Sequence, residues 1–175
     1  MATHEKSASS KETSHGKTAE MTIFEVLKQD HEKARYLFDK IGKSGKKDVS
    51  SLQKLFAQLE EELDIHMEGE ERFVYTALEQ SDEIRDLVLQ AFEEHQVAKT
   101  LLGTFKNLAV DDERWMAKIN VLQEIVEHHM QEEEHEMFKM GKKFLNKDQM
   151  HDIALQFQRS KREGRKPSRG APVEG

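Results

Sequence analysis

Two pairs of the form His-x-x-x-Glu carry the strongest chemical signal in this sequence. They are His66 with Glu70 and His129 with Glu133. Residues four apart on an α-helix lie one above the other, so each pair can direct an imidazole and a carboxylate at one point. Imidazole and carboxylate together suit iron, manganese or zinc. The spacing therefore predicts metal ligands on each of two helices.

Apolar residues that recur every three or four positions predict the helices that must position these pairs. Four such stripes run through about residues 22–42, 50–77, 81–105 and 111–141. Thr22 and Glu25 should form a capping box, and Ser81 and Asp111 should cap the third and fourth helices. Each stripe includes one histidine, and two stripes include a glutamate. The inward polar residues predicted in this way are His31, His66, Glu70, His95, His129 and Glu133.

The chain contains a weak internal repeat. His31 and His66 are 35 positions apart, and His95 and His129 are 34 positions apart. Each half is a helix with one inward histidine, followed by a helix with an inward His-x-x-x-Glu pair. This predicts two helical hairpins related by a pseudo-twofold axis. The repeat also favours His129 over His128, which lies about 100° off the stripe.

These helices predict an all-α fold, an antiparallel up-down four-helix bundle with a short extra C-terminal helix. The bundle should span residues 22–145, and the extra helix should span residues 146–159 and pack on an end of the bundle. Residues 1–21 and the basic residues 160–175 are predicted to be disordered tails. Glutamates beside the predicted ligands, such as Glu71 and Glu134, are interpreted as solvent-facing.

Six nitrogen and oxygen ligands are too many for one ordinary site and suit two metal ions bridged by the carboxylates. A solvent-derived bridge would complete five ligands on each metal and leave one position for a small molecule. A hydrogen-bonded core histidine is the ordinary explanation for any single helix. It does not explain all four helices, because inward carboxylates are rarely buried unless they are paired or bound to metal.

Composition excludes several other classes of protein. The net charge of -7 argues against a general nucleic-acid binder. The absence of cysteine removes disulfides, thiolate zinc sites and iron–sulfur clusters. No apolar run approaches the ~20 residues that a membrane span needs, and the polar first residues lack an apolar signal region. We therefore expect a cytoplasmic protein with no nucleic-acid or membrane partner.

About residues 22–145 resemble the hemerythrin family, specifically the bacterial HHE cation-binding domains with four histidines and two glutamates. The resemblance rests on His31, the His66/Glu70 pair, His95 and the His129/Glu133 pair, with Phe138 beyond. It implies a left-handed four-helix bundle with a non-haem di-iron centre. The two iron ions (Fe2+/Fe3+) would be bridged by an oxo or hydroxo group and two carboxylates. Activities in the family include oxygen binding, oxygen or redox sensing, iron handling, and reactions with peroxide or nitric oxide.

The sequence departs from the oxygen-carrying hemerythrins at two places. Those proteins have a fifth histidine where this chain has Lys99, and they end in an aspartate five residues after the last histidine, whereas this chain has the His129-x-x-x-Glu133 spacing. The departure argues against reversible oxygen carriage and leaves one metal a protein ligand short. Water, Tyr75, Glu132 or His128 could take that position.

Two classes of function follow from the resemblance. The favoured one is a protein that binds or senses dioxygen, peroxide or nitric oxide at a di-iron centre. The other is a redox enzyme that decomposes peroxide or nitric oxide, or an iron-handling protein. A ferritin-like bundle agrees less well, because its Glu-x-x-His motif has the reverse order. A histidine phosphotransfer bundle would need an exposed histidine, whereas these histidines lie on core stripes.

Overall fold

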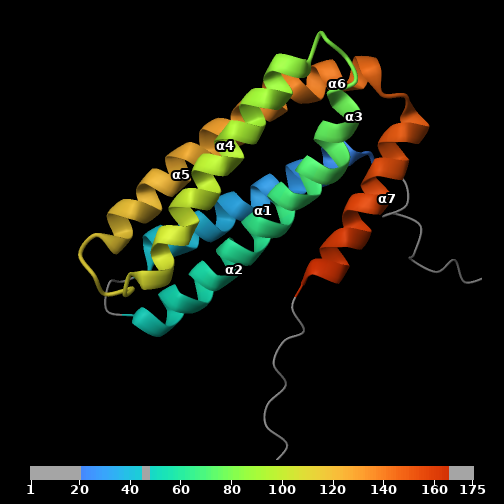
Figure 1. The fold of residues 1–175 in the computed structure, drawn as a ribbon. Helices are drawn as coiled ribbons and strands as arrows, with labels where there is room; N and C mark the ends of the chain where they lie inside the picture. The colour runs from blue at the N-terminus through green and yellow to red at the C-terminus, as the bar shows by residue number, and fades with distance from the viewer. Residues whose placement is uncertain (1–20, 45–47, 166–175) are drawn as a thin grey trace, which may run out of the picture.

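The computed structural model describes residues 21–44 and 48–165, and the regular elements within them are all helical. A four-helix bundle is formed by α1 (Ile23–Lys43), α2 (Val49–Gly69), α4 (Arg85–Gly103) and α5 (Trp115–Glu132) (Figure 1). Shorter segments extend these helices: η1 (Glu70–Tyr75), α3 (Thr76–Leu78), η2 (Thr104–Asn107), η3 (Glu133–Met137) and α6 (Phe138–Phe144). The last helix is α7 (Lys147–Gly164). The predicted all-α bundle with an extra C-terminal helix is confirmed.

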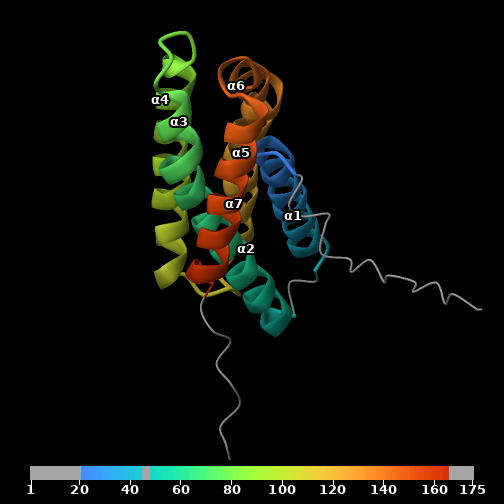
Figure 2. The same ribbon diagram turned by 90° about the vertical axis from the view of Figure 1, so that its right-hand side faces the viewer.

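The bundle consists of two helical hairpins. α1 packs on α2, and α4 packs on α5. The hairpins face each other, since α1 also contacts α5 and α2 contacts α4. Their long axes run side by side in both views (Figure 1, Figure 2). This is the paired arrangement that the internal repeat predicts.

The predicted start of α1 is confirmed, whereas α4 and α5 begin later than predicted. The backbone N–H of Thr22 donates to Glu25 Oε2 at 2.8 Å as part of the capping box. Before α4, the N–H of Ile84 donates to the carbonyl oxygen of Ser81, so the predicted cap begins a turn and not the helix. α5 likewise begins at Trp115 after a turn. Both Ile84 and Trp115 are buried, so these turns carry large side chains into the core.

Each hairpin contains a π-helical segment that begins at a predicted metal ligand. η1 begins at Glu70, and η3 begins at Glu133. A π turn holds more residues than an α turn, so it rotates the residues that follow it. The apolar stripe predicted through residues 50–77 would bury Phe73, three residues after Glu70. After η1 begins, however, Val74 and Tyr75 are buried, whereas Phe73 is only half-buried. The prediction of one continuous stripe is therefore wrong beyond the ligand.

Two glycines lie inside helices at points of close packing. A Cβ atom added at Gly69 would lie 2.5 Å from the ring of Phe157, and one added at Gly141 would lie 2.5 Å from the ring of Phe24. The sequence predicts that Gly141 ends the fourth helix, but α6 continues to Phe144. That prediction is wrong because this glycine makes room for an aromatic ring.

The hydrophobic core is divided into two clusters. One includes Leu59 and Trp115, toward the α1–α2 and α4–α5 connections. The other includes residues of α3, α6 and α7. The predicted ligands lie between the two clusters, as His31 does between Leu27 of one and Ala34 of the other. The polar centre is thus closed off by apolar packing above and below.

α7 differs from the prediction in length and in position. It spans 18 residues and continues past the predicted end at residue 159 to Gly164. It lies along α1, α2 and η1 and not on an end of the bundle (Figure 2). Its last turns are held by tertiary contacts, because Phe157 is fully buried and Lys161 pairs with Asp30. Residues 160–164 are therefore helical, whereas the tails predicted for residues 1–20 and 166–175 lie outside the described residues.

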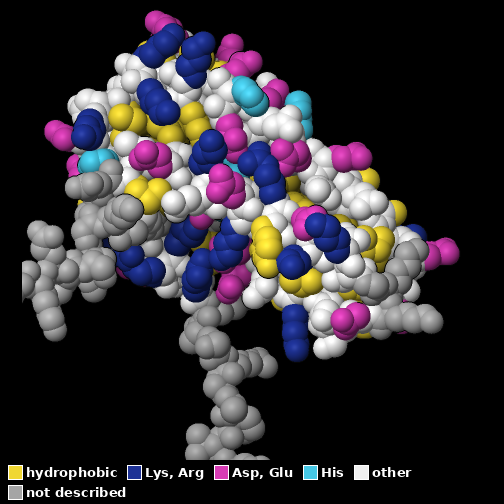
Figure 3. All heavy atoms as spheres, turned by 180° about the vertical axis from the view of Figure 1, so that it is seen from behind, with side chains coloured by type: hydrophobic (Ala, Val, Ile, Leu, Met, Phe, Trp, Pro, Cys, Tyr) yellow, Lys and Arg dark blue, Asp and Glu magenta, His cyan; other side chains and the backbone are white. Residues whose placement is uncertain are grey.

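The surface of the bundle is strongly charged. Acidic and basic side chains are interspersed on the face seen in Figure 3. Exposed large apolar side chains include Leu89 on α4 and Leu155 on α7. Within residues 21–44 and 48–165, no helix is long and apolar enough to cross a membrane.

Candidate metal centre

All six predicted ligands lie together inside the bundle, and each is at most 7% exposed. One histidine comes from each of α1, α2, α4 and α5, and the glutamates are the first residues of η1 and η3. The helical spacing places each pair on an inward face, as the sequence predicts. The six residues are His31, His66, Glu70, His95, His129 and Glu133.

The atoms that could bind metal form two groups that share Glu70. The first group is His31, His66, Glu70 and Glu133, whose ligand-type atoms lie within 4.8 Å of one another. The second group is Glu70, His95 and His129, at the same spacing. Two groups that share a carboxylate are the arrangement expected of two adjacent metal positions.

Each glutamate reaches from its own hairpin to the other. Glu70 Oε2 lies 3.2 Å from His66 Nε2 and 3.4 Å from His95 Nε2. Glu133 Oε2 lies 3.5 Å from His129 Nε2 and 3.3 Å from His31 Nε2. Both carboxylates are therefore placed where they could bridge the two positions.

Several of these buried atoms have no hydrogen-bond partner among the described residues. They are Nε2 of His31 and His66, both carboxylate oxygens of Glu70, and Oε2 of Glu133. An unpaired buried polar group costs about 1–3 kcal/mol, and more if it is charged. A metal ion would satisfy these atoms together, since each presents a lone pair to the same centre. The six residues therefore fit a metal pair.

The spacing between ring nitrogens also fits a metal ion. Two ligands held about 2.1 Å from one metal at a right angle lie about 3 Å apart. His95 Nε2 and His129 Nε2 are 3.0 Å apart. At this distance one imidazole can donate a hydrogen bond to the other, and two imidazoles that bind one ion would have the same spacing.

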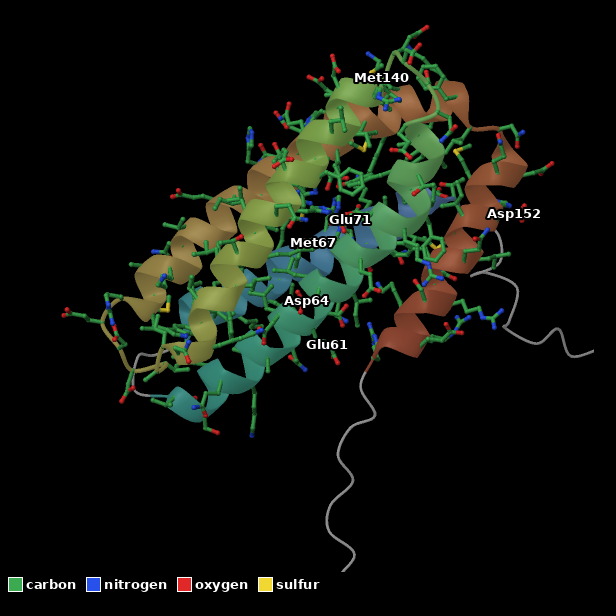
Figure 4. The ribbon with its side chains drawn as sticks, in the orientation of Figure 1. Glu61, Asp64, Met67, Glu71, Met140 and Asp152 are labelled. Atoms are coloured by element: carbon green, nitrogen blue, oxygen red, sulfur yellow. The ribbon has the colours of Figure 1, made fainter. Side chains whose placement is uncertain are left out.

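Each of the four histidines also faces a carboxylate through its other ring nitrogen. The distances from Nδ1 are 2.8 Å for His31 to Glu134, 3.4 Å for His66 to Asp30, 2.9 Å for His95 to Glu71 and 2.8 Å for His129 to Glu94. An imidazole that donates its Nδ1–H keeps Nε2 as a free lone pair for metal. The sequence predicts that Glu71 and Glu134 face solvent, and this prediction is wrong. Glu71, a residue of η1 that is labelled in Figure 4, contacts His95 of α4, and Glu134 contacts His31.

Cations hold three of these four carboxylates. Arg35 donates to Glu134 at 2.9 Å, and Lys99 donates to Glu71 at 2.6 Å. Lys161 of α7 donates to Asp30. The fourth carboxylate, Glu94, accepts from the neutral amide of Gln90 at 2.9 Å. Lys99 thus has a definite role at the position where the oxygen carriers have a histidine.

The internal repeat contains a signal that would have identified these partners. An acid directly precedes the inward histidine of α1 and of α4, and an acid directly follows each inward glutamate. A basic residue also follows His31 and His95 by four positions. Each hairpin supplies one of these carboxylates to a histidine of its own and one to a histidine of the other hairpin. The repeat therefore extends to the hydrogen-bond partners of the ligands.

The two halves of the internal repeat differ at one residue beside the centre. Tyr75 and Phe138 each lie five residues after an inward glutamate. Tyr75 stacks on His95 with ring centroids 5.3 Å apart, and Phe138 stacks on His31 at 5.9 Å. Only the tyrosine carries a hydroxyl, which donates to Glu133 Oε1 at 2.8 Å and lies 3.3 Å from His95 Nε2. Tyr75 is therefore a polar group at the His95 side of the centre.

The other two side chains considered for the missing ligand position point away from the centre. The side chain of His128 is 66% exposed and that of Glu132 is 38% exposed, and they lie 3.4 Å from each other. They gather with Glu94 at the surface. The choice of His129 over His128 agrees with this geometry.

The carboxylates and imidazoles of the centre shift one another's pKa. Burial and the charge of Glu133 raise the pKa of Glu70 well above its usual range. Burial acts in the same direction on Glu133, but the charges of His129 and His31 beside it outweigh burial and lower the pKa of Glu133. Burial lowers the pKa of His66 to about 4. The pKa of His31 is raised, because the neighbouring carboxylates of Glu133 and Glu134 outweigh its burial.

An apolar cavity adjoins the four histidines on the side of the α1–α2 and α4–α5 connections. Its lining includes both inward alanines and the residues next to the ligands on α2 and α5: Ala34, Leu63, Met67, Ala98, Val126 and Met130. Asp30 and Glu62 also line it, toward the α7 side. A small uncharged molecule could therefore lie against the histidine nitrogens, because such a molecule gives up little hydration when it enters an apolar cavity.

The chain is similar to known proteins. Residues 22–141 match the model of the hemerythrin HHE cation-binding domain family. A DNA nickase from Nostoc sp. is 26% identical over 142 residues, which cover 81% of this chain and 40% of the nickase. An uncharacterized hemerythrin-like protein from Schizosaccharomyces pombe is 25% identical over 142 residues, covering 80% of this chain and 69% of that protein. This chain thus spans well under half the length of the nickase.

A solved structure supports the fold. The crystal structure of a hemerythrin HHE cation-binding domain-containing protein from Mycobacterium kansasii superimposes with a TM-score of 0.72 at 21% identity. The match covers 82% of this chain and 87% of that protein. The family match extends over most of the bundle and includes all six buried ligand-type residues. The chain therefore belongs to the hemerythrin HHE cation-binding domain family.

Proposed function

We propose that the six residues hold two iron ions bridged by Glu70 and Glu133, and that the protein binds or senses dioxygen, peroxide or nitric oxide there. The observation that carries the proposal is the pair of buried ligand groups that share Glu70. Their ring nitrogens and carboxylate oxygens are left unpaired toward one centre. Family membership supports metal binding, and the mixture of imidazole and carboxylate suits iron.

The protein's own residues would orient the ligands and exclude water. Iron at this centre would supply reversible redox change and an open position for a small ligand. The outer carboxylates fix the ring orientation of the histidines by accepting from Nδ1–H. The two core clusters keep bulk water out, and the apolar cavity favours small uncharged molecules over charged ones. Lys99 donates to Glu71. It therefore would not supply the fifth nitrogen ligand that a histidine provides in the oxygen carriers.

A redox enzyme that decomposes peroxide or nitric oxide is the second candidate, and Tyr75 favours it. The buried phenol lies between His95 and Glu133 and could donate a proton at that point. Iron handling is a third use of the same ligands. The DNA nickase relative does not extend the proposal to DNA, because this chain spans 40% of that protein and carries a net charge of -7. We propose a cytoplasmic role without a nucleic-acid or membrane partner.

The first test is the iron content of the purified protein, with optical spectra of its oxidised and reduced forms. We expect close to two iron ions per chain. Near-zero iron, or a single zinc ion, would contradict the di-iron proposal. A dioxygen adduct that persists after the reduced protein is mixed with air would support binding or sensing. Rapid autoxidation with catalytic loss of peroxide would support the enzyme.

A further inference from the structure

α7 lies outside the part of the chain that matches the family model, yet it reaches the candidate metal centre. The family match ends at residue 141, and α7 begins at Lys147. α7 packs on α1, α2 and η1, which together carry half of the proposed ligands. Two of its side chains, Phe157 and Lys161, contact the surroundings of one ligand, His66.

Lys161 acts on His66 through Asp30. The Lys161 ammonium donates to Asp30 Oδ1, and His66 Nδ1 lies 3.4 Å from Asp30 Oδ2. The side chains of Lys161 and Asp30 are each 13% exposed, so solvent screens this pair only weakly. The 3.4 Å contact is the longest of the four contacts between histidine and carboxylate. Of the four carboxylates, Asp30 is therefore held least by its histidine, and its orientation depends most on Lys161.

Phe157 contacts the same histidine directly. Its ring meets the His66 imidazole edge to face, with centroids 6.2 Å apart and an interplanar angle of 87°. Gly69 permits this approach, because a Cβ atom there would lie 2.5 Å from the Phe157 ring. The ring and the Asp30 carboxylate thus limit the rotation of His66 at two points. The Phe157 ring belongs to α7, and the Asp30 carboxylate is held by Lys161 of α7.

Within the described residues, no contact of this kind from outside the bundle supports the other hairpin. The corresponding carboxylate, Glu94, accepts from Gln90, which lies on α4 one turn before it. The cations on Glu71 and Glu134 come from α4 and α1, within the bundle itself. Among the four carboxylate partners, the one that serves His66 is therefore held by a residue from outside the bundle.

We propose that α7 is part of the metal centre, with Lys161 and Phe157 positioning His66, so that retention of one of the two metal ions depends on this helix. The inference rests on the proposed di-iron centre. It assigns positioning residues that the family match does not include. The position served by His31 and His66 should depend on α7, whereas the position served by His95 and His129 should not.

The test is iron release from the full-length, iron-loaded protein to a strong chelator, comparing wild type with Lys161→Met. Methionine keeps most of the apolar length of the lysine but removes the ammonium, which donates to Asp30 and lies 5.7 Å from the centroid of the Phe157 ring. Loss of a partner outside the ligand shell typically weakens metal binding about 10–100-fold. We expect one of the two iron ions to leave about tenfold faster, and the other to leave at the wild-type rate. In Mössbauer spectra of the loaded protein, one of the two iron environments should change.

Matched variants separate positioning from general stability. Lys161→Arg should restore slow release, because it returns the cation. Arg159→Met is the control on the same helix, since Arg159 is exposed and, within the described part of the chain, its ion pair is with Glu163 one turn away. Asp30→Asn should reproduce the selective loss without a substitution in α7 itself. Circular dichroism and the melting temperature report whether each variant remains folded.

The outcomes distinguish this inference from the proposal on which it rests. A wild-type protein without iron would overturn the di-iron centre itself. A wild type with two iron ions, together with unchanged release from both Lys161→Met and Asp30→Asn, would overturn the role of α7 alone. Equal acceleration of both iron ions in folded variants would also overturn it, because the effect would not be confined to the His66 side.

Discussion

At the scale of single residues, the centre depends on histidines that direct their two ring nitrogens at different partners. The Nδ1 side of each ring faces a carboxylate, and the Nε2 side faces the centre. This arrangement makes neighbouring residues chemically different. His129 is buried among ligands, whereas His128 is mostly exposed.

The first prediction compares these two neighbours. His129→Ala and Glu133→Ala should each lose most of the bound metal, because each removes an inward ligand. His128→Ala is the matched control one residue away, and it should keep close to the wild-type content. Metal analysis of the purified variants measures the effect. Loss of metal from the control, with retention in the other two, would show that the helix register is wrong.

At the scale of elements, two π-helical segments and two interior glycines decide how the helices pass the centre. η1 and η3 turn the chain so that an aromatic residue follows each inward glutamate and stacks on a histidine of the other hairpin. Gly69 then allows α7 to approach α2 closely. The position of α7 thus depends on the lack of a side chain at Gly69.

The second prediction concerns that glycine. Gly69→Ala should lower the free energy of unfolding by about 1–3 kcal/mol, because the added carbon overlaps the buried Phe157 ring. Gly103→Ala is the control within α4, since a Cβ atom there meets nothing within 4 Å. The control should be neutral or should stabilise by about 0.5–1 kcal/mol. Denaturant unfolding measures both, and equal effects would contradict the packing argument.

At the scale of the whole molecule, the buried charges couple metal binding to pH. The pKa of His31 and that of His129 are raised, and the pKa of Glu70 is raised well above its usual range. A ligand with a raised pKa keeps its proton to a higher pH, and it must lose that proton to bind metal. Metal binding should therefore release protons.

The third prediction follows from the upward direction of these pKa shifts. Metal affinity should be highest above the raised pKa values and should fall as the pH is lowered through them. The fall should begin at a higher pH than it would for unperturbed side chains, because His31, His129 and Glu70 then bind protons in place of metal. Metal content after equilibration between about pH 8 and about pH 5 measures this. Metal content that stays constant across that range would contradict it.

The sequence alone determined the bundle and the six inward residues. Helical periodicity that continues through a histidine or a glutamate places that residue in the core, and the hairpin repeat selects one register. Both signals are local, since each depends on spacing along a single helix.

Only the tertiary structure decided the rest. Glu71 and Glu134 looked solvent-facing because their partners lie on the other hairpin, about 24 and 103 positions away along the chain. The π segments shifted the stripe after each inward glutamate, and α7 lay along the bundle because Gly69 left room for Phe157. Spacing along one helix specifies which face a residue occupies. It cannot specify which residue of another element meets it there, and that pairing holds the ligands in place.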